Sequence, residues 1–305
     1  MAQRNIFLSL TNNEDDYQLA LAESASTAAR AHGFHLEIQF SENDAVLQVQ
    51  QILAALMSKE CHYDAIISEP VGTGMEQAAR LAVKNGVAWG ILNHYTEYVS
   101  ALRRSDSKAV IFEVTNDHYE IGRIQGKQAA ALMPQGGLAL YLEGPATGGA
   151  ARQRTEGMMA AKPRNVEMKT LKGDWTQSGM RRTFSNWLSL STSRKLGVSA
   201  IISQDDGMAI GAREAIESTL SGAEREHWLR LPFTGCDGLP DGGQALVQRG
   251  LLAATIVVSP NSGLAIELLA KALRGEQIPE RSVGAAASFP SIEKLAEQYR
   301  RLLAH

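Results

Sequence analysis

The sequence predicts an α/β protein with parallel sheets in two lobes. Apolar runs of strand length alternate with stretches of helical periodicity, and this alternation is typical of parallel sheets covered by helices on both faces. The runs are almost continuously apolar, as expected for strands that are buried on both faces. At 305 residues the chain is longer than one typical hydrophobic core, which favours two domains.

Each strand is expected at an apolar run bounded by polar or turn-forming residues. In chain order these strands are expected over residues 6–10, 35–40, 65–68, 88–92, 109–114, 138–142, 168–171, 200–203, 231–236 and 253–258. The segments between them carry apolar residues at near-helical spacing, which predicts helices such as those over residues 19–31, 47–57, 75–83 and 121–132.

Two segments of the sequence are similar to each other. DAIISEPVGTGMEQAARLA at 64–82 and SAIISQDDGMAIGAREAIE at 199–217 both contain Ala-Ile-Ile-Ser, followed by polar residues and an amphipathic helix. Two α/β lobes that are built alike would show this similarity. Because no Gly/Ser-rich or low-complexity tract separates the halves, several short crossovers are expected in place of one flexible tether.

The last segment, SIEKLAEQYRRLLAH at 291–305, is expected to form an amphipathic helix. Its apolar stripe consists of Ile292, Leu295, Tyr299, Leu302 and Leu303. We expect the stripe to pack against its own lobe, and the alternative is a dimer contact or a connection to a following domain.

The composition is that of a globular protein with balanced charge. The formal net charge is −3 and no block of basic residues occurs, so nucleic acid is not expected as a partner. With only two cysteines, no disulfide framework is expected. No apolar run is long enough to span a bilayer, and the N-terminus MAQRNIFLSL lacks the apolar segment of a secretory signal. We therefore expect a cytoplasmic protein unless a leader has been removed.

Polar side chains gather where the predicted strands end. In open α/β sheets, ligands bind outside the carboxyl ends of the strands. The side chains expected at such ends come from both halves of the sequence and are Glu69, Asn93 with His94, Asp174 with Trp175, Asp205, and Asp237. This distribution predicts a ligand-binding cleft between two lobes.

No catalytic or metal-binding motif occurs in the sequence. The Gly-rich stretch LALYLEGPATGGAARQRTEG at 138–157 has Ala150 and Ala151 where a phosphate-binding loop needs Lys and Ser or Thr. Neither Gly-x-Ser-x-Gly nor His-Glu-x-x-His is present, and two distant cysteines make no zinc pattern. We therefore expect no enzymatic activity, no metal and no cofactor. Arg152, in the same stretch, is either a guanidinium beside the cleft or a solvated surface charge.

Two further candidates lie between predicted strands and turns. Trp175 in KGDWTQSGM is either a stacking surface for the C–H faces of a sugar or a residue packed at the lobe surface. Asp237 in TGCDGLPDGGQAL is either a ligand-binding carboxylate or a turn-forming residue.

Two adjacent acids, Asp205 and Asp206 in ISQDDGMAIGA, stand at a predicted strand-to-helix junction. One of them is expected to cap the helix, because an Asp at the first turn accepts otherwise unpaired backbone N–H groups. Adjacent residues at a helix start point in different directions, so a joint catalytic or magnesium-binding role is not expected.

The chain resembles the type I periplasmic sugar-binding proteins, the ribose-binding protein group, which share a fold with the ligand domains of lac-repressor-like regulators. The resemblance covers nearly the whole chain and rests on the order and spacing of four segments: SLTNN at 9–13, GPATGGAARQRTEGM at 144–158, ISQDDGMAIGA at 202–212 and TGCDGLPDGGQALVQRGLLAATI at 234–256. It implies two Rossmann-like lobes joined by three hinge crossovers, near residues 115–118, 257–260 and 285–289.

The resemblance also implies how the chain is divided between the lobes. The N-terminal lobe would comprise residues 1–116 and 260–286. The C-terminal lobe would comprise residues 117–259 and 287–305.

The same resemblance implies which residues contact a ligand. Together with Glu69, which is added for its place at a strand end, the ligand-binding residues would be Asn13, Tyr17, Asn93, His94, Arg152, Trp175, Asp205 and Asp237. Asp206 would then be the structural acid that caps the helix. His94 stands where the ribose group usually has Arg, and Asp205 stands where it commonly has Asn, so a sugar other than ribose, a polyol or an amino-bearing ligand is open.

The function implied by the resemblance is binding without chemistry. The lobes would close on a small polyhydroxylated ligand, and the protein would deliver it to the permease of an ABC importer. The alternatives are the sensing domain of a transcriptional regulator or of a membrane receptor. A monomer is implied, located in the periplasm, or extracellular and lipid-anchored, if a leader has been removed.

Overall fold

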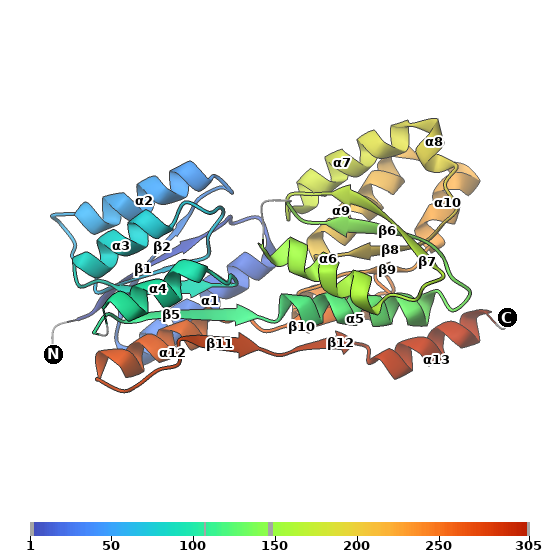
Figure 1. Ribbon diagram of the computed structural model, residues 1–305. Helices are drawn as coiled ribbons and strands as arrows, with labels where there is room; N and C mark the ends of the chain where they lie inside the picture. The colour runs from blue at the N-terminus through green and yellow to red at the C-terminus, as the bar shows by residue number, and fades with distance from the viewer. Residues whose placement is uncertain (1–2, 107, 146–148, 304–305) are drawn as a thin grey trace. The chain divides into compact units, whose positions relative to one another are not determined.

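The computed structural model describes residues 3–106, 108–145 and 149–303 (Figure 1). Residues 146–148 of the Gly-rich stretch, and the side chains of Leu302 and Leu303 in the C-terminal stripe, lie outside this description. The chain forms two compact units, of which unit 1 consists of Met1–Asn116 and Pro260–Gly284, and unit 2 of Asp117–Ser259 and Ala285–His305. It therefore passes between the units after residues 116, 259 and 284.

Unit 1 contains a six-stranded sheet in the order β11-β5-β4-β3-β1-β2, in which every neighbouring pair is parallel. Its elements are β1 (Asn5–Leu10), α1 (Asp16–His32), β2 (His35–Phe40), α2 (Ala45–Met57), β3 (Ala65–Ser68), α3 (Glu76–Lys84), β4 (Ala88–Leu92), α4 (Glu97–Ser105), β5 (Ile111–Asn116), α12 (Ser262–Leu273) and β11 (Arg281–Gly284).

Helices cover both faces of this sheet, as the continuous apolar runs of its strands require (Figure 1). On one face, Ile52 of α2, Ala79 of α3 and Leu102 of α4 belong to the same buried cluster as Ile66 and Trp89 of the strands. On the other face, α1 and α12 lie side by side, and the Ser262 hydroxyl donates to the Leu21 carbonyl at 2.6 Å. At the carboxyl ends of the strands, the sheet is followed by loops.

Unit 2 contains a four-stranded parallel sheet in the order β7-β6-β8-β9 and an antiparallel pair, β10 with β12. Its elements are α5 (His118–Leu132), β6 (Gly137–Glu143), α6 (Gly149–Ala161), β7 (Val166–Lys172), α7 (Gln177–Ser189), α8 (Ser191–Arg194), β8 (Val198–Ser203), α9 (Asp206–Thr219), α10 (Gly222–Arg230), β9 (Phe233–Thr234), a π-helical turn (Pro240–Gln244), α11 (Ala245–Gln248), β10 (Thr255–Val258), β12 (Ala286–Phe289) and α13 (Ile292–Leu303).

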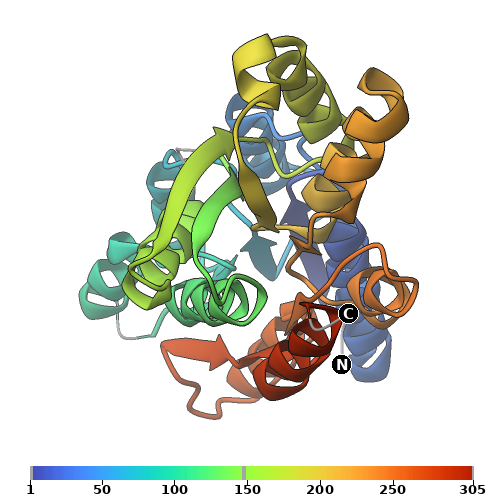
Figure 2. The same ribbon diagram turned by 90° about the vertical axis from the view of Figure 1, so that its right-hand side faces the viewer.

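Helices lie on both faces of the sheet of unit 2 (Figure 1 and Figure 2), and alternate residues of β6 pack against the two helix layers. Leu140 and Leu142 pack with the buried residues of α7, α9 and α10, whereas Tyr141 packs with those of α5 and α6. The helices α5 and α6 approach closely, because a Cβ atom on Gly157 would lie 2.0 Å from the Tyr119 carbonyl oxygen.

The two sheets share one strand order, which confirms the predicted fold class. Parallel bridges from Thr234 to Ala254 and from Asp237 to Val257 connect β9 to β10. The resulting order β7-β6-β8-β9-β10-β12 corresponds to β2-β1-β3-β4-β5-β11 of unit 1. The two Ala-Ile-Ile-Ser segments, 65–68 in β3 and 200–203 in β8, occupy equivalent places in this order.

The C-terminal helix α13 packs on α5 of its own unit. Leu295 is buried in the α5 layer, Tyr299 packs beside it and Ile292 is half-buried. Across the described part of the chain, none of the helices has the length and apolar character that crossing a membrane would require.

Candidate functional site

In unit 1, polar side chains meet where β3, β4 and β5 end. Glu69 follows β3 and is buried, and its two carboxylate oxygens accept hydrogen bonds from Gln18 Nε2 at 2.8 Å and from Asn93 Nδ2 at 3.0 Å. Asn93 follows β4 and has a φ of 55°, a left-handed conformation that Asn adopts more readily than most residues. The amide of Asn93 is therefore directed at Glu69 by the turn of the chain after the strand.

Two more asparagines extend this network. Asn116 ends β5, and its Nδ2 donates to Asn93 Oδ1 at 3.1 Å and to the Tyr17 hydroxyl oxygen at 3.2 Å. Asn261 precedes α12, and its Nδ2 donates to the same Asn93 oxygen at 2.6 Å. The structure thus brings the predicted residues Tyr17, Glu69 and Asn93 together, and adds Asn116 and Asn261, which the sequence analysis missed although Asn116 lies just beyond a predicted strand.

The two other predicted residues of unit 1 are Asn13 and His94. Asn13 is exposed in the loop after β1, where the buried Asn12 shapes the turn by accepting from the backbone N–H groups of Glu14 and Asp15, each at 2.9 Å. His94 is half-buried, and its Nδ1 lies 3.2 Å from the Leu92 carbonyl oxygen.

In unit 2, the structure gives the capping role to Asp205 and not to Asp206. Asp205 caps α9, since its backbone is extended and its Oδ1 accepts from the Met208 N–H at 2.6 Å. Asp206 is the first helical residue, and it points away, accepting from the Gly238 N–H and the Thr255 hydroxyl, each at 2.8 Å. The expectation that Asp206 caps the helix is therefore wrong, because the helix begins at Asp206 itself, one residue earlier than that role requires.

Capping does not occupy the whole Asp205 carboxylate. A carboxylate oxygen of Asp205 and one of Asp237 lie within 4.8 Å of each other, and both residues are buried. Burial raises the pKa of Asp205, and it raises the pKa of Asp206 to about 8. These acids therefore hold their protons more tightly than exposed carboxyl groups, and groups that donate hydrogen bonds or carry positive charge are favoured beside them.

Arg154, which the sequence analysis missed, is the cation that faces these acids. It is buried in α6, donates through Nη1 to the Gln204 carbonyl oxygen, and has its guanidinium 5.4 Å from the ring centre of Trp175. The charges of Asp205 and Asp237 act on it and favour its protonated form.

Arg152, the predicted candidate, is elsewhere. Its side chain is 73% exposed and pairs with Glu156 of the same helix at 3.8 Å. The structure therefore does not bring Arg152 to the other candidates described in unit 2, and its exposed side chain fits the alternative of a solvated surface charge. Arg154 shares the buried face of α6 with Ala151 and Met158, but the weak apolar pattern of this helix does not mark that face in the sequence.

The backbone is strained at three of the predicted residues. Positive φ angles outside glycine occur among the described residues at Glu42, Asn43, Asn93, Trp175 and Asp237. Trp175 has a φ of 68° and Asp237 a φ of 107°, conformations that bulky or branched side chains rarely adopt. Such strain persists only where the surrounding structure fixes it, and it clusters at functional sites.

Comparison with known proteins places this geometry in a family. A family model described as periplasmic binding protein domain matches residues 6–277. The chain belongs to the periplasmic binding protein family. Among the relatives of this periplasmic binding protein, the ribose import binding protein of Salmonella typhimurium is 26% identical over 286 residues, which cover 91% of this chain and 88% of the relative.

Solved structures confirm the fold of this periplasmic binding protein. The periplasmic solute-binding protein of an ABC transporter from Actinobacillus succinogenes, with bound D-allose, has a TM-score of 0.79 at 20% identity and covers 97% of this chain and 100% of its own. The Caulobacter myo-inositol binding protein, bound to myo-inositol, has a TM-score of 0.79 at 17% identity and covers 97% of this chain and 96% of its own.

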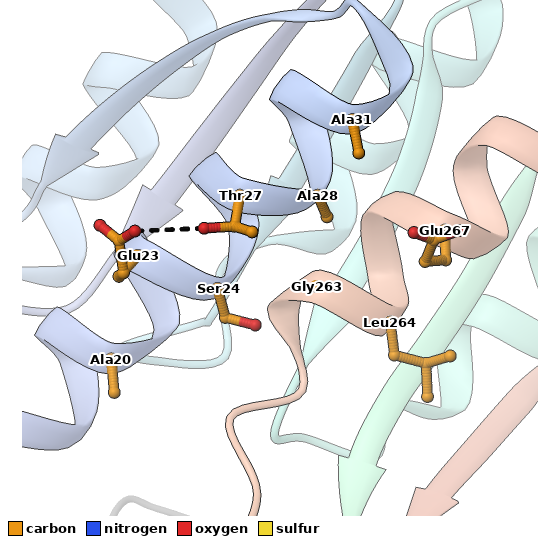
Figure 3. Close-up of a pocket in the computed structure, with 9 residues that line it drawn as sticks. All are labelled: Ala20, Glu23, Ser24, Thr27, Ala28, Ala31, Gly263, Leu264 and Glu267. Carbon is orange, nitrogen blue, oxygen red and sulfur yellow. Dashed lines mark hydrogen bonds between the residues drawn. The ribbon is translucent and has the colours of Figure 1, made fainter.

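A separate groove of about 640 Å³ runs along unit 1 of this periplasmic binding protein between α1 and α12 (Figure 3). Small side chains line most of it, and Glu23, which accepts from the Thr27 hydroxyl at 3.1 Å, stands at one side. The groove lies on a helical face and not at the carboxyl ends of the strands, so it is distinct from the polar networks described above.

Proposed function

We propose that this protein binds a small polyhydroxylated ligand, namely a sugar, a polyol or an amino sugar, and delivers it to the permease of an ABC importer. Residues from both units contact the ligand. In unit 1 they are Asn13, Tyr17, Glu69, Asn93 and His94, and in unit 2 they are Arg154, Trp175, Asp205 and Asp237. The protein catalyses no reaction on the ligand.

The observation that carries this proposal is the arrangement in unit 2 of an aromatic ring, a guanidinium and two carboxylates. The Trp175 ring offers apolar area to the C–H face of a sugar at little entropic cost. The carboxylates of Asp205 and Asp237 accept hydrogen bonds from hydroxyl or ammonium groups, and Arg154 donates to ligand oxygens. A ligand that presents alternating C–H faces and hydroxyl groups satisfies all of these side chains.

The relatives support the remaining parts of the proposal. One is named an import binding protein for ribose, and the two solved structures hold D-allose and myo-inositol. By the same similarity we propose a periplasmic location and action as a monomer. Nucleic acid is not among the proposed partners, because the chain carries a formal net charge of −3.

Thermal-shift measurements against a panel of sugars, polyols, amino sugars, nucleotides, amino acids and peptides test the function. A ligand at 100 times its dissociation constant adds about 2.7 kcal/mol to the stability of the folded state. We expect at least one sugar, polyol or amino sugar to give a shift of several degrees. A shift given only by nucleotides, amino acids or peptides would contradict the proposal.

A further inference from the structure

Glu113 is a buried carboxylate of unit 1 that lies outside the polar network of Glu69 and Asn93. It sits within β5, and its side chain is fully buried. One carboxylate oxygen accepts from both the backbone N–H and the hydroxyl of Thr96, each at 2.8 Å. The other accepts from Arg281 Nε at 2.9 Å. Because a buried carboxylate is costly unless it is paired and hydrogen-bonded, these partners are what keep Glu113 in place.

The partners of Glu113 hold the segment that follows β4. This segment, residues 93–96, starts with the candidate ligand residues Asn93 and His94 and ends at Thr96, which precedes α4. A Thr at this position ordinarily turns its hydroxyl to the helix backbone, whereas here the hydroxyl donates to Glu113. The end of the segment is therefore fixed to β5 by two hydrogen bonds.

Arg281 holds the same segment from its other side. Its guanidinium lies over the ring of Tyr95, with 3.9 Å between the guanidinium carbon and the ring centre. Arg281 begins β11, and the chain leaves unit 1 at the ends of β5 and β11. Glu113 and Arg281 thus hold Tyr95 and Thr96, the two residues after His94, against β5 and β11. We call this pair the clamp.

We propose that Glu113 is a positioning residue that, together with Arg281, sets the placement of His94 for ligand binding. This inference rests on the proposed function, because it requires that His94 contacts the ligand. A hydrogen-bonded, charge-paired clamp suits this task, since charge-assisted bonds are short and directional. Loss of the clamp then lowers affinity although Glu113 does not touch the ligand.

Asp64 provides a matched control in the same unit. It also accepts from a backbone N–H, that of Asn5 at 2.9 Å, and from an arginine, Arg4 at 2.5 Å. It lies just before β3, at the amino end of the strands and away from the candidate residues. Asp64→Asn therefore shows how far the loss of a paired acid of unit 1 affects binding when that acid is remote from the candidate ligand residues.

The test compares Glu113→Gln, Glu113→Ala and Asp64→Asn with the wild-type protein. Calorimetric titrations use D-ribose, D-allose, myo-inositol and D-glucosamine, and urea melts give the folded fraction of each variant. Amide hydrogen exchange is followed at Thr96, whose N–H donates to Glu113, and at Asn93, whose N–H donates to the Val114 carbonyl oxygen at 2.9 Å.

We expect Glu113→Ala to lower affinity by about tenfold, the order of magnitude seen when partners that orient binding groups are removed. Exchange at Thr96 should accelerate while exchange at Asn93 is unchanged. Glu113→Gln keeps an acceptor for the Thr96 N–H, so its affinity should lie between those of Glu113→Ala and the wild type. If Glu113→Ala does not fold, Glu113→Gln alone tests the inference. Asp64→Asn should retain the wild-type affinity.

Two outcomes overturn the inference in different ways. The positioning role is overturned if both Glu113 variants bind within about twofold of the wild-type affinity. It is also overturned if Asp64→Asn loses as much affinity as the Glu113 variants. Either result leaves the proposed function standing. A wild-type protein that binds none of the four probes, and no other sugar or polyol, overturns the proposed function and this inference with it.

Discussion

Removal of the Arg154 guanidinium is the perturbation whose effect the structure defines best. Arg154→Met keeps the length and apolar volume of the side chain but removes its charge. The variant loses the bond to the Gln204 carbonyl oxygen and the interaction with the Trp175 ring at 5.4 Å. A hydrogen bond from a charged group contributes about 1.5–3 kcal/mol, and a desolvated cation–π contact contributes about 2 kcal/mol. The buried carboxylate of Asp205 also loses a cation that favours its ionised form.

These losses predict effects on both affinity and stability. We expect Arg154→Met to lower ligand affinity by about a hundredfold, which corresponds to about 2.8 kcal/mol. The free energy of unfolding should fall by about 3 kcal/mol, as is usual when one partner of a buried charged group is removed. Calorimetric titration and urea melts measure the two quantities on the same sample.

Arg152→Met is the matched control, two residues away in the same helix. The Arg152 side chain is 73% exposed and its partner Glu156 is 3.8 Å away, so both quantities should stay within about 0.5 kcal/mol of the wild type. If Arg152→Met lost affinity while Arg154→Met kept it, the reasoning from burial would be refuted. If Arg154→Met lost stability alone, Arg154 would be a structural residue.

Three further outcomes are expected. Trp175→Ala should weaken binding by roughly 2–4 kcal/mol, as truncation of a buried binding anchor does, and unchanged affinity in a titration would exclude stacking. Burial raises the pKa of Asp206 to about 8, above the ordinary value of about 3.9, so its contribution to stability is fully present below about pH 4 and is lost as the pH rises towards 8. Urea melts between pH 4 and 8 should show a flatter pH dependence for Asp206→Asn, and an equal slope would contradict this origin. Gly157→Ala should cost about 1–3 kcal/mol of folding stability, because its Cβ would meet the Tyr119 carbonyl oxygen at 2.0 Å. In the same melts Gly149→Ala should cost nothing, because no atom of the described residues would lie within 4 Å of its Cβ.

The sequence predicted the fold where burial alone decides the structure. The runs 65–68 and 88–92 are strands over the expected residues, since every residue in them is buried and their apolar character is nearly continuous. The run 35–40 is also a strand over the expected residues, although it lies at the sheet edge and none of its residues is fully buried. The strands β11 and β12 were missed because Arg-Ser-Val-Gly and Ala-Ala-Ser-Phe show no apolar run. Both lie at sheet edges, where hydrogen bonding to a neighbouring strand, and not burial of an apolar run, stabilises the strand.

The candidate site was predictable as far as strand ends mark it. Glu69, Asn93, Asp205 and Asp237 all follow strands or parallel bridges, as the apolar runs indicated. The sequence did not show which of two nearby side chains, such as Arg152 and Arg154, faces the interior of the unit. Which arginine of α6 faces inward depends on the phase of a helix rich in Ala and Gly, whose weak apolar pattern does not fix the phase.

The division of unit 1 into two separated stretches of sequence has a consequence for the newly made chain. The outer edge of β5 pairs with β11, and α12 covers part of the sheet, but both are synthesised only after the whole of residues 117–259. At usual elongation rates, roughly ten to thirty seconds pass between the completion of β5 and that of β11. Throughout this time the first five strands have an open edge, which is a template for pairing with other chains. Unit 1 is therefore completed only late in synthesis, when α12 and β11 join the strands of the first 116 residues.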